Sequence, residues 1–96
     1  MVNPLFRREL IAEFDSNPIG RHSPGLRALL DVMRGGPDVG RYVLYCTQPY
    51  AEWVLGRLTG DREDPIRLTN HVFHSLLDAE RAVFRLRWKD HTGEDI

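Results

Sequence analysis

Cysteine is almost absent from this sequence, which contains Cys46 alone among its 96 residues. A single cysteine cannot form a disulfide within the chain, so nothing points to an oxidising compartment. Cys46 lies in the middle of a predicted strand with one face buried, and no base is assigned to it. We therefore expect a small core side chain at this position and not a nucleophile.

Long apolar runs and an excess charge of one sign are also missing. No stretch approaches the roughly 20 apolar residues of a membrane span, and the N-terminus lacks an apolar run followed by a small-residue cleavage site. We therefore expect a cytoplasmic protein that does not enter a membrane. Thirteen basic and fourteen acidic residues give a net charge of -1, which provides no overall basic field to attract nucleic acid.

Recognisable catalytic and metal-binding patterns are absent as well. His71 and His74 precede a predicted helix, and no cysteine or carboxylate spacing beside them matches a zinc pattern. The acidic loop 61–64 is typical of a solvated turn, and there is no GxSxG, phosphate-binding glycine loop or dinucleotide fingerprint. We predict no catalytic residue, metal ligand or cofactor on this chain.

The strongest signal that is present predicts a long helix over residues 75–91. Ser75 followed by Asp78 is a capping-box pattern, and no glycine or proline interrupts the chain again until Gly93. Helical spacing sorts the apolar residues of this segment into two stripes. The first stripe, expected to cover the chain's own sheet, comprises Leu76, Ala79, Ala82, Val83 and Leu86. The second stripe comprises Leu77, Phe84 and Trp88.

The second stripe leaves two interpretations open. Two apolar stripes are more than one side of a small domain needs, which favours an interface that anchors a partner through Phe84 and Trp88. In that case, Trp88→Ala weakens partner binding and leaves the isolated chain stable. In the alternative interpretation, Phe84 and Trp88 pack against the N-terminal helices of the same chain.

Two shorter helices are predicted before the sheet. Asn3-Pro4 resembles a capped helix start, and an apolar residue recurs every four positions from Phe6 to Phe14, so we expect a helix over residues 4–14. Ser23-Pro24 begins a second helix over residues 24–34, which Gly35 ends.

After Gly40 the apolar period changes from about 3.6 to 2, which predicts strands at 41–46, 52–58 and 66–68. Strands spaced this closely must be antiparallel. The prediction is therefore an α+β fold in one small domain over residues 1–96. It consists of two short N-terminal helices (1–37), a small three-stranded antiparallel sheet (40–69) and a long C-terminal helix packed on that sheet (75–91).

The linker between the first two helices is a further candidate site. Residues 17–24 include two prolines and one glycine, which give a restricted path from which Arg21 and His22 project. We predict that Arg21 or His22 engages a carboxylate, a backbone carbonyl or a partner surface. A solvent-exposed loop is the alternative.

Three segments together resemble the small (alpha) subunit of bacterial N,N-dimethylformamidase. They read NPIGRHSPGL at 17–26, GRYVLY at 40–45 and FxSLxxAxxAVFRLRW at 73–88. The resemblance covers about residues 17–88, while the N-terminal segment is shorter than in that family. It implies a non-catalytic chain in a hetero-oligomer with a large iron-containing amidohydrolase subunit. That large subunit hydrolyses the C–N bond of small N-substituted formamides and carries the metal ligands.

Six residues are predicted to bind the partner, four on the final helix and two in the linker: Leu77, Arg81, Phe84, Trp88, Arg21 and His22. A rival hypothesis is a nucleic-acid-binding module of strand-strand-strand-helix order, with tyrosines and Arg57, Arg62 and Arg67 on its sheet. The net charge argues against it. A free-standing enzyme would require a catalytic set that we do not find.

Overall fold

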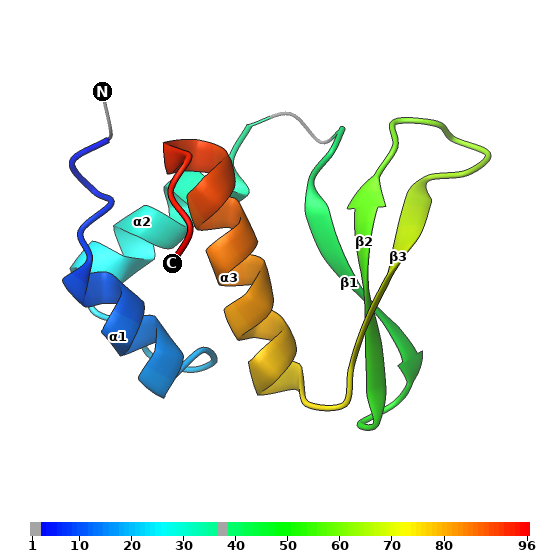
Figure 1. Ribbon diagram of the computed structural model, residues 1–96, viewed down its shortest axis with the longest axis horizontal. Coiled ribbons are helices and arrows are strands. Elements are labelled where there is room, and N and C mark those ends of the chain that lie inside the picture. Colours follow the sequence, from blue (N-terminus) through cyan, green and yellow to red (C-terminus); the bar gives the residue numbers. More distant parts are fainter. Residues whose placement is uncertain (1–2, 37–38) are drawn as a thin grey trace. The chain divides into compact units, whose positions relative to one another are not determined.

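The computed structural model describes residues 3–36 and 39–96 of the chain. Two helices come first, a three-stranded antiparallel sheet follows, and a C-terminal helix ends the chain (Figure 1). This order confirms the predicted α+β class. The elements are α1 (Glu9–Ser16), α2 (Pro24–Arg34), β1 (Tyr42–Gln48), β2 (Glu52–Leu58), β3 (Ile66–Phe73) and α3 (Leu76–Thr92).

The chain divides into two compact units, each with its own internal packing. The helical unit comprises Met1–Gly36 and Phe84–Ile96, and the sheet unit comprises Pro37–Val83. Helix α3 therefore contributes its first half to the sheet unit and its second half to the helical unit. That residues 1–96 form one small domain stays a prediction.

Helix α1 begins later than the sequence pattern predicted. The expected start at Pro4 is wrong, because Asn3 caps a tight turn there and not a helix. Its Oδ1 accepts a hydrogen bond from the Leu5 N–H at 2.9 Å, and its carbonyl oxygen accepts one from the Phe6 N–H at 3.0 Å. The helix itself runs from Glu9 to Ser16.

Helix α2 follows the prediction closely. Ser23 adopts an extended backbone conformation, and its side chain accepts a hydrogen bond from the Leu26 N–H at 3.2 Å. This is the cap expected for a helix with proline at its first position. The helix ends at Arg34, before Gly35.

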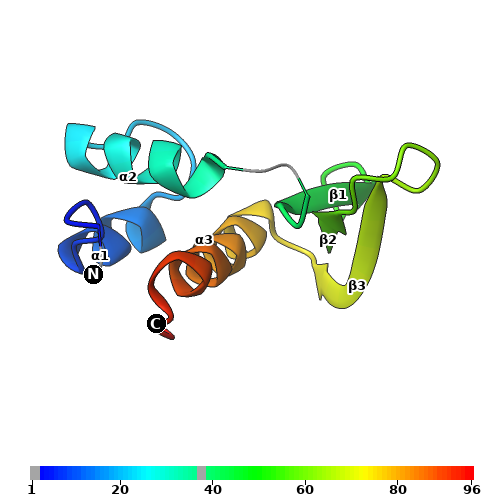
Figure 2. The same ribbon diagram turned by 90° about the horizontal axis from the view of Figure 1, so that it is seen from above.

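The helical unit has one apolar core, to which α1, α2 and the second half of α3 all contribute (Figure 2). Its buried members are Leu10, Phe14, Leu26, Leu29, Leu30, Met33, Phe84 and Trp88. Phe6 lies before α1 and packs partly buried against this cluster. Residues from both ends of the sequence therefore stabilise one another.

The sheet is a meander in the order β1-β2-β3 (Figure 1). Strand β3 continues to Phe73, so the prediction that it ends at Leu68 is wrong. The register between β2 and β3 is irregular, because the segment of β3 from Leu68 to Val72 lies opposite the shorter segment of β2 from Gly56 to Val54. This irregularity interrupts the two-residue apolar period that marks a strand in the sequence. The hydroxyl of Thr69 donates a hydrogen bond to the Leu55 carbonyl at 2.9 Å and holds this irregular segment in place.

Helix α3 begins as its capping pattern predicted. The Ser75 hydroxyl accepts a hydrogen bond from the Asp78 N–H at 3.3 Å, which satisfies one of the first unpaired amides of the helix. At the other end the Gly93 N–H bonds to the Lys89 carbonyl at 2.7 Å, and Gly93 has a φ of 76°. Glycine tolerates this left-handed conformation, so the helix stops there.

Candidate functional site

Two residues of the predicted interface stripe lie in the core of the helical unit. Phe84 and Trp88 are each 2% exposed and pack with residues of α1 and α2. The expectation that these rings are exposed on the free chain is therefore wrong. The alternative interpretation, in which the N-terminal helices cover them, describes what the structure contains.

Aromatic contacts fix these two rings in the core. The Phe84 ring stacks on Phe14 with a centroid distance of 4.2 Å and an interplanar angle of 13°. Phe6 meets Trp88 edge to face at 5.1 Å. Such pairs add roughly 0.5–1.5 kcal/mol each to the gain from burial alone. The apolar content of α3 thus serves intrachain packing at these positions.

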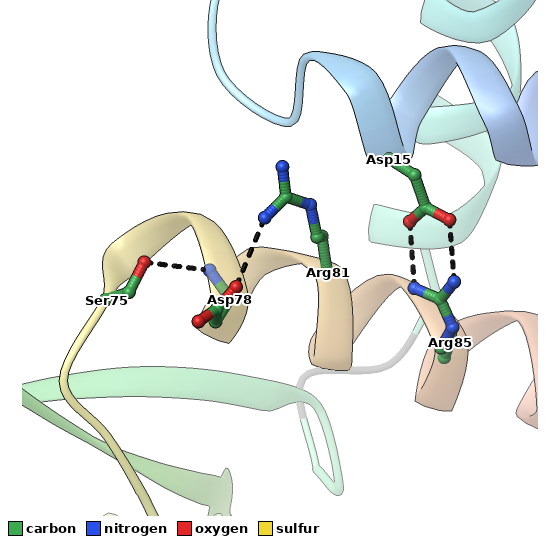
Figure 3. A network of polar contacts seen from close by, with 5 residues as sticks. All are labelled: Asp15, Ser75, Asp78, Arg81 and Arg85. Atoms are coloured by element: carbon green, nitrogen blue, oxygen red, sulfur yellow. Dashed lines mark hydrogen bonds and ion pairs between the residues drawn. The ribbon is translucent and has the colours of Figure 1, made fainter.

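A bidentate ion pair also joins two helices of the helical unit, and the sequence pattern did not predict it. The Arg85 guanidinium donates to both carboxylate oxygens of Asp15, at 2.8 Å and 2.6 Å (Figure 3). This hydrogen bonding raises the pKa of Arg85 above its ordinary value, although burial acts in the opposite direction. The residues are 70 positions apart, so periodicity could not pair them.

Leu77 and Arg81 lie at the start of α3, in the sheet unit. Leu77 is 43% exposed, which leaves its side chain available to a second molecule. Arg81 donates to the Asp78 carboxylate at 3.1 Å, one helical turn earlier (Figure 3). Of the predicted stripe, Leu77 alone therefore stays on the surface.

The linker after α1 is held by side-chain hydrogen bonds. Asn17 Nδ2 donates to the Arg21 carbonyl at 3.2 Å, and a ring nitrogen of His22 lies 2.8 Å from the Asn17 carbonyl. The His22 ring also stacks on Phe14, with centroids 5.9 Å apart. His22 therefore engages a backbone carbonyl, one of the contacts that the sequence analysis expected, while the Arg21 side chain is exposed.

A glutamate fastens the end of this linker to α1. The two Glu13 carboxylate oxygens accept hydrogen bonds from the Ser23 N–H at 2.7 Å and the Ser23 hydroxyl at 2.6 Å. These two bonds, first the hydroxyl and then the amide, lower the pKa of Glu13 below its ordinary value. The linker thus has a defined path into the cap of α2.

An open hollow of about 620 Å³ lies beside this linker within the helical unit. The linker forms one wall, which includes Arg21 and His22, and α2 forms the other. The structure therefore brings both predicted linker residues to one concave surface.

The sheet unit exposes apolar side chains in a pattern that strand register explains. Tyr45 lies opposite Val54, which in turn lies opposite Val72, so these three share one face across the sheet. Leu68 lies opposite Gly56 on the same face, two residues along β2. Tyr45, Leu68 and Val72 are 49%, 48% and 46% exposed. We call the surface formed by these three residues the apolar sheet face.

The other face of the sheet carries two of the three arginines of the rival hypothesis, Arg57 and Arg67, whereas Arg62 lies in the loop between β2 and β3. Arg57 lies opposite Tyr42 on one side and opposite Arg67 on the other. The Arg57 guanidinium sits over the Tyr42 ring at 4.5 Å, and its Nε donates to the Gly40 carbonyl at 2.9 Å. Arg57 is therefore committed to contacts within its own unit.

No described residues assemble a metal site. Within residues 3–36 and 39–96, no group of three or more His, Cys, Asp or Glu side chains is placed to hold a metal ion. Cys46 is exposed on β1, so the expectation of a buried core position is wrong. Every residue of β1 from Tyr45 to Gln48 is exposed, so burial does not alternate between the two faces at this end of the strand.

These features define a small α+β protein with a closed helical core, an exposed apolar sheet face and an open hollow beside a fixed linker. The model of one protein family, the N,N-dimethylformamidase alpha subunit, matches residues 1–95. The chain belongs to this family, as the resemblance indicated. No curated protein matches the chain significantly. In the part of the chain that the structure describes, no helix has both the length and the apolar character to cross a membrane.

Proposed function

We propose that this chain is the non-catalytic small subunit of a bacterial, cytoplasmic hydrolase complex. Its partner is a large iron-dependent amidohydrolase subunit that acts on small N-substituted formamides such as N,N-dimethylformamide. The family match over residues 1–95 is the observation that carries this proposal, because the family is described as a subunit. A chain described in this way assembles with at least one other chain into a hetero-oligomer.

The hydrolytic step is assigned to the partner. Among the described residues no group of three or more His, Cys, Asp or Glu side chains is placed to hold a metal ion, and the proposal gives iron no role on this chain. The contribution of this chain is then binding. It holds the large subunit in its active assembly through surfaces that stay exposed after the chain has folded.

The apolar sheet face is the first of these surfaces. Tyr45, Leu68 and Val72 each keep about half of their surface exposed on one face of the sheet. Contiguous exposed apolar side chains are typical of protein interfaces, and tyrosine is enriched among residues that anchor them. Leu77 and Arg81 at the start of α3 are further contact residues in this proposal.

Phe84 and Trp88 are not proposed as direct contacts. Both lie in the core of the helical unit, and binding through them would require that core to open. Their role in assembly is indirect, because they keep the unit folded.

Co-purification with the large subunit tests this function. The chain is expressed together with the large subunit of the proposed complex, and a tag on the large subunit is used for capture. The wild-type chain is expected to co-purify and to support hydrolysis of N,N-dimethylformamide. Tyr45→Ser should weaken capture, with a cost of about 2 kcal/mol or more if Tyr45 is an anchor.

Tyr50→Ser is the matched control. Tyr50 is a fully exposed tyrosine in the turn between β1 and β2, and it is not part of the apolar sheet face. Its replacement should leave capture unchanged. Equal loss for both variants would refute the assignment of the apolar sheet face, and failure of the wild-type chain to co-purify would refute the subunit role itself.

A further inference from the structure

Three arginines border the hollow in the helical unit: Arg21, Arg27 and Arg34. Residues at i, i+3, i+4 and i+7 share one side of a helix, and this side of α2 faces the hollow. In order, these residues are Arg27, Leu30, Asp31 and Arg34. Arg21 comes from the opposite wall, the linker of residues 20–22.

The hollow carries uncompensated positive charge. Three guanidinium groups face one carboxylate, that of Asp31, which leaves an excess of two positive charges when His22 is counted as neutral. Asp31 follows Arg27 by four residues and precedes Arg34 by three, and side chains at these spacings are neighbours on a helix. Even so, within the described residues no ion pair or side-chain hydrogen bond engages any of the three guanidinium groups.

Other arginines of the same unit are paired. Arg8 contacts Glu94, and Arg85 forms its bidentate pair with Asp15. The paired arginines therefore bind carboxylates of their own unit. Arg21, Arg27 and Arg34 are instead available to a group from outside the chain.

The linker places Arg21 before any ligand arrives. Gly20 has a φ of 121°, a conformation that side chains rarely adopt, and it lies against Asn17. Asn17 in turn binds the Arg21 carbonyl, and Ser23 is tied to Glu13. Such a fixed path lowers the entropy lost when a ligand binds.

We propose that this hollow binds an acidic segment of the partner subunit, with carboxylates that pair with Arg21, Arg27 and Arg34. The inference rests on the proposed function and names the chemistry of one contact in the assembly. Guanidinium groups bind carboxylates through two parallel hydrogen bonds, which gives such a contact geometric specificity.

A protein segment suits the hollow better than nucleic acid does. The chain as a whole has a net charge of -1, so it lacks the broad basic field that a phosphate backbone requires. The hollow itself also contains an apolar side chain, Leu30, and a carboxylate, Asp31. Leu30 favours a peptide segment that mixes apolar and acidic side chains, and the Asp31 carboxylate repels a row of phosphates.

Charge reversal tests the inference on the full-length chain. The dissociation constant of the purified large subunit is measured for wild type, Arg27→Glu and Arg34→Glu, at low and at physiological ionic strength. Each reversal should raise the dissociation constant about tenfold or more and should flatten its salt dependence. Arg62→Glu is the matched control, because Arg62 is an exposed arginine in the loop of the sheet unit. It should change the dissociation constant less than about twofold.

Two further measurements distinguish between the possible occupants of the hollow and between loss of charge and loss of folding. Arg27→Gln removes the charge without reversing it and should give an intermediate loss of affinity, with thermal unfolding unchanged. A short single-stranded RNA is titrated against the wild type and the same variants.

Wild-type affinity and salt dependence in both hollow variants would overturn the inference and leave the subunit role standing. Absence of any binding by the wild type would instead overturn the subunit role, and the inference with it. RNA binding that the hollow variants lose would make nucleic acid the occupant and would also overturn the inference.

Discussion

Truncation of Trp88 should destabilise the isolated chain strongly. Its side chain is 2% exposed, belongs to the core of the helical unit and meets Phe6 edge to face at 5.1 Å. Replacing a buried tryptophan by alanine costs about 3–5 kcal/mol, because both the transfer energy and the cavity count against the folded state. This loss is a large part of the total stability of a small domain, which is of order 5–15 kcal/mol.

Urea unfolding followed by far-ultraviolet circular dichroism provides the measurement. With a slope of roughly 1–3 kcal/mol per molar, Trp88→Ala should lower the midpoint by about 1 M or more or leave the chain unfolded. Trp88→Phe is the matched control and should cost less, since it keeps an aromatic ring in the cavity. The indole Nε1 of Trp88 is buried without a hydrogen-bond partner in the described chain, so this exchange removes no such bond. Unchanged unfolding of Trp88→Ala together with weakened partner binding would refute the packing assigned to this ring.

Two further predictions concern single positions in each unit. Gly56→Ala should destabilise the sheet unit by about 1–3 kcal/mol, because the new Cβ would lie 2.9 Å from Cγ2 of the stiff, β-branched side chain of Ile66. In Gly25→Ala the new Cβ would instead contact the flexible end of Arg7. Thermal unfolding should therefore show a loss of stability for Gly56→Ala and little loss for Gly25→Ala. Glu13→Gln should reduce the loss of folding stability in acid. Because the pKa of Glu13 is lowered in the folded chain, its carboxylate contributes stability above the ordinary glutamate pKa, and this contribution is lost as the pH falls through the lowered pKa of the folded state. Equal slopes for Glu13→Gln and wild type in acid would contradict the role given to Ser23 as its partner.

Local signals in the sequence were sufficient for most of the secondary structure. Ser23 and Ser75 cap their helices as expected, since capping depends on residues within one turn. The start of α1 was misplaced because Asn-Pro begins a turn as readily as a helix, and the choice depends on what Phe6 packs against.

Long-range partners were beyond the reach of sequence patterns. The amphipathic stripe correctly marked Phe84 and Trp88 as residues that need an apolar partner, but periodicity says nothing about whether that partner is the same chain. Leu10 and Phe14 supply it here, from 70 or more positions away. The Asp15–Arg85 pair was missed for the same reason.

The candidate surfaces were predicted in part. The linker was identified by its two prolines, which fix φ wherever they occur, and by Gly20, which tolerates the positive φ found there. Its connection to Arg27 and Arg34 required the packing of α2 beside it, which the sequence alone does not specify. The apolar sheet face required the register of three strands and the irregularity in β3.

The molar mass of the purified assembly tests the central claim most directly. The chain and the large subunit of the proposed complex are mixed and analysed by size-exclusion chromatography with light scattering. The subunit role predicts one peak that contains both chains, with a mass equal to a whole-number sum of the two. Elution of this chain alone at its own mass of 11.1 kDa or a multiple of it, beside a large subunit that hydrolyses N,N-dimethylformamide equally well without it, would contradict the account.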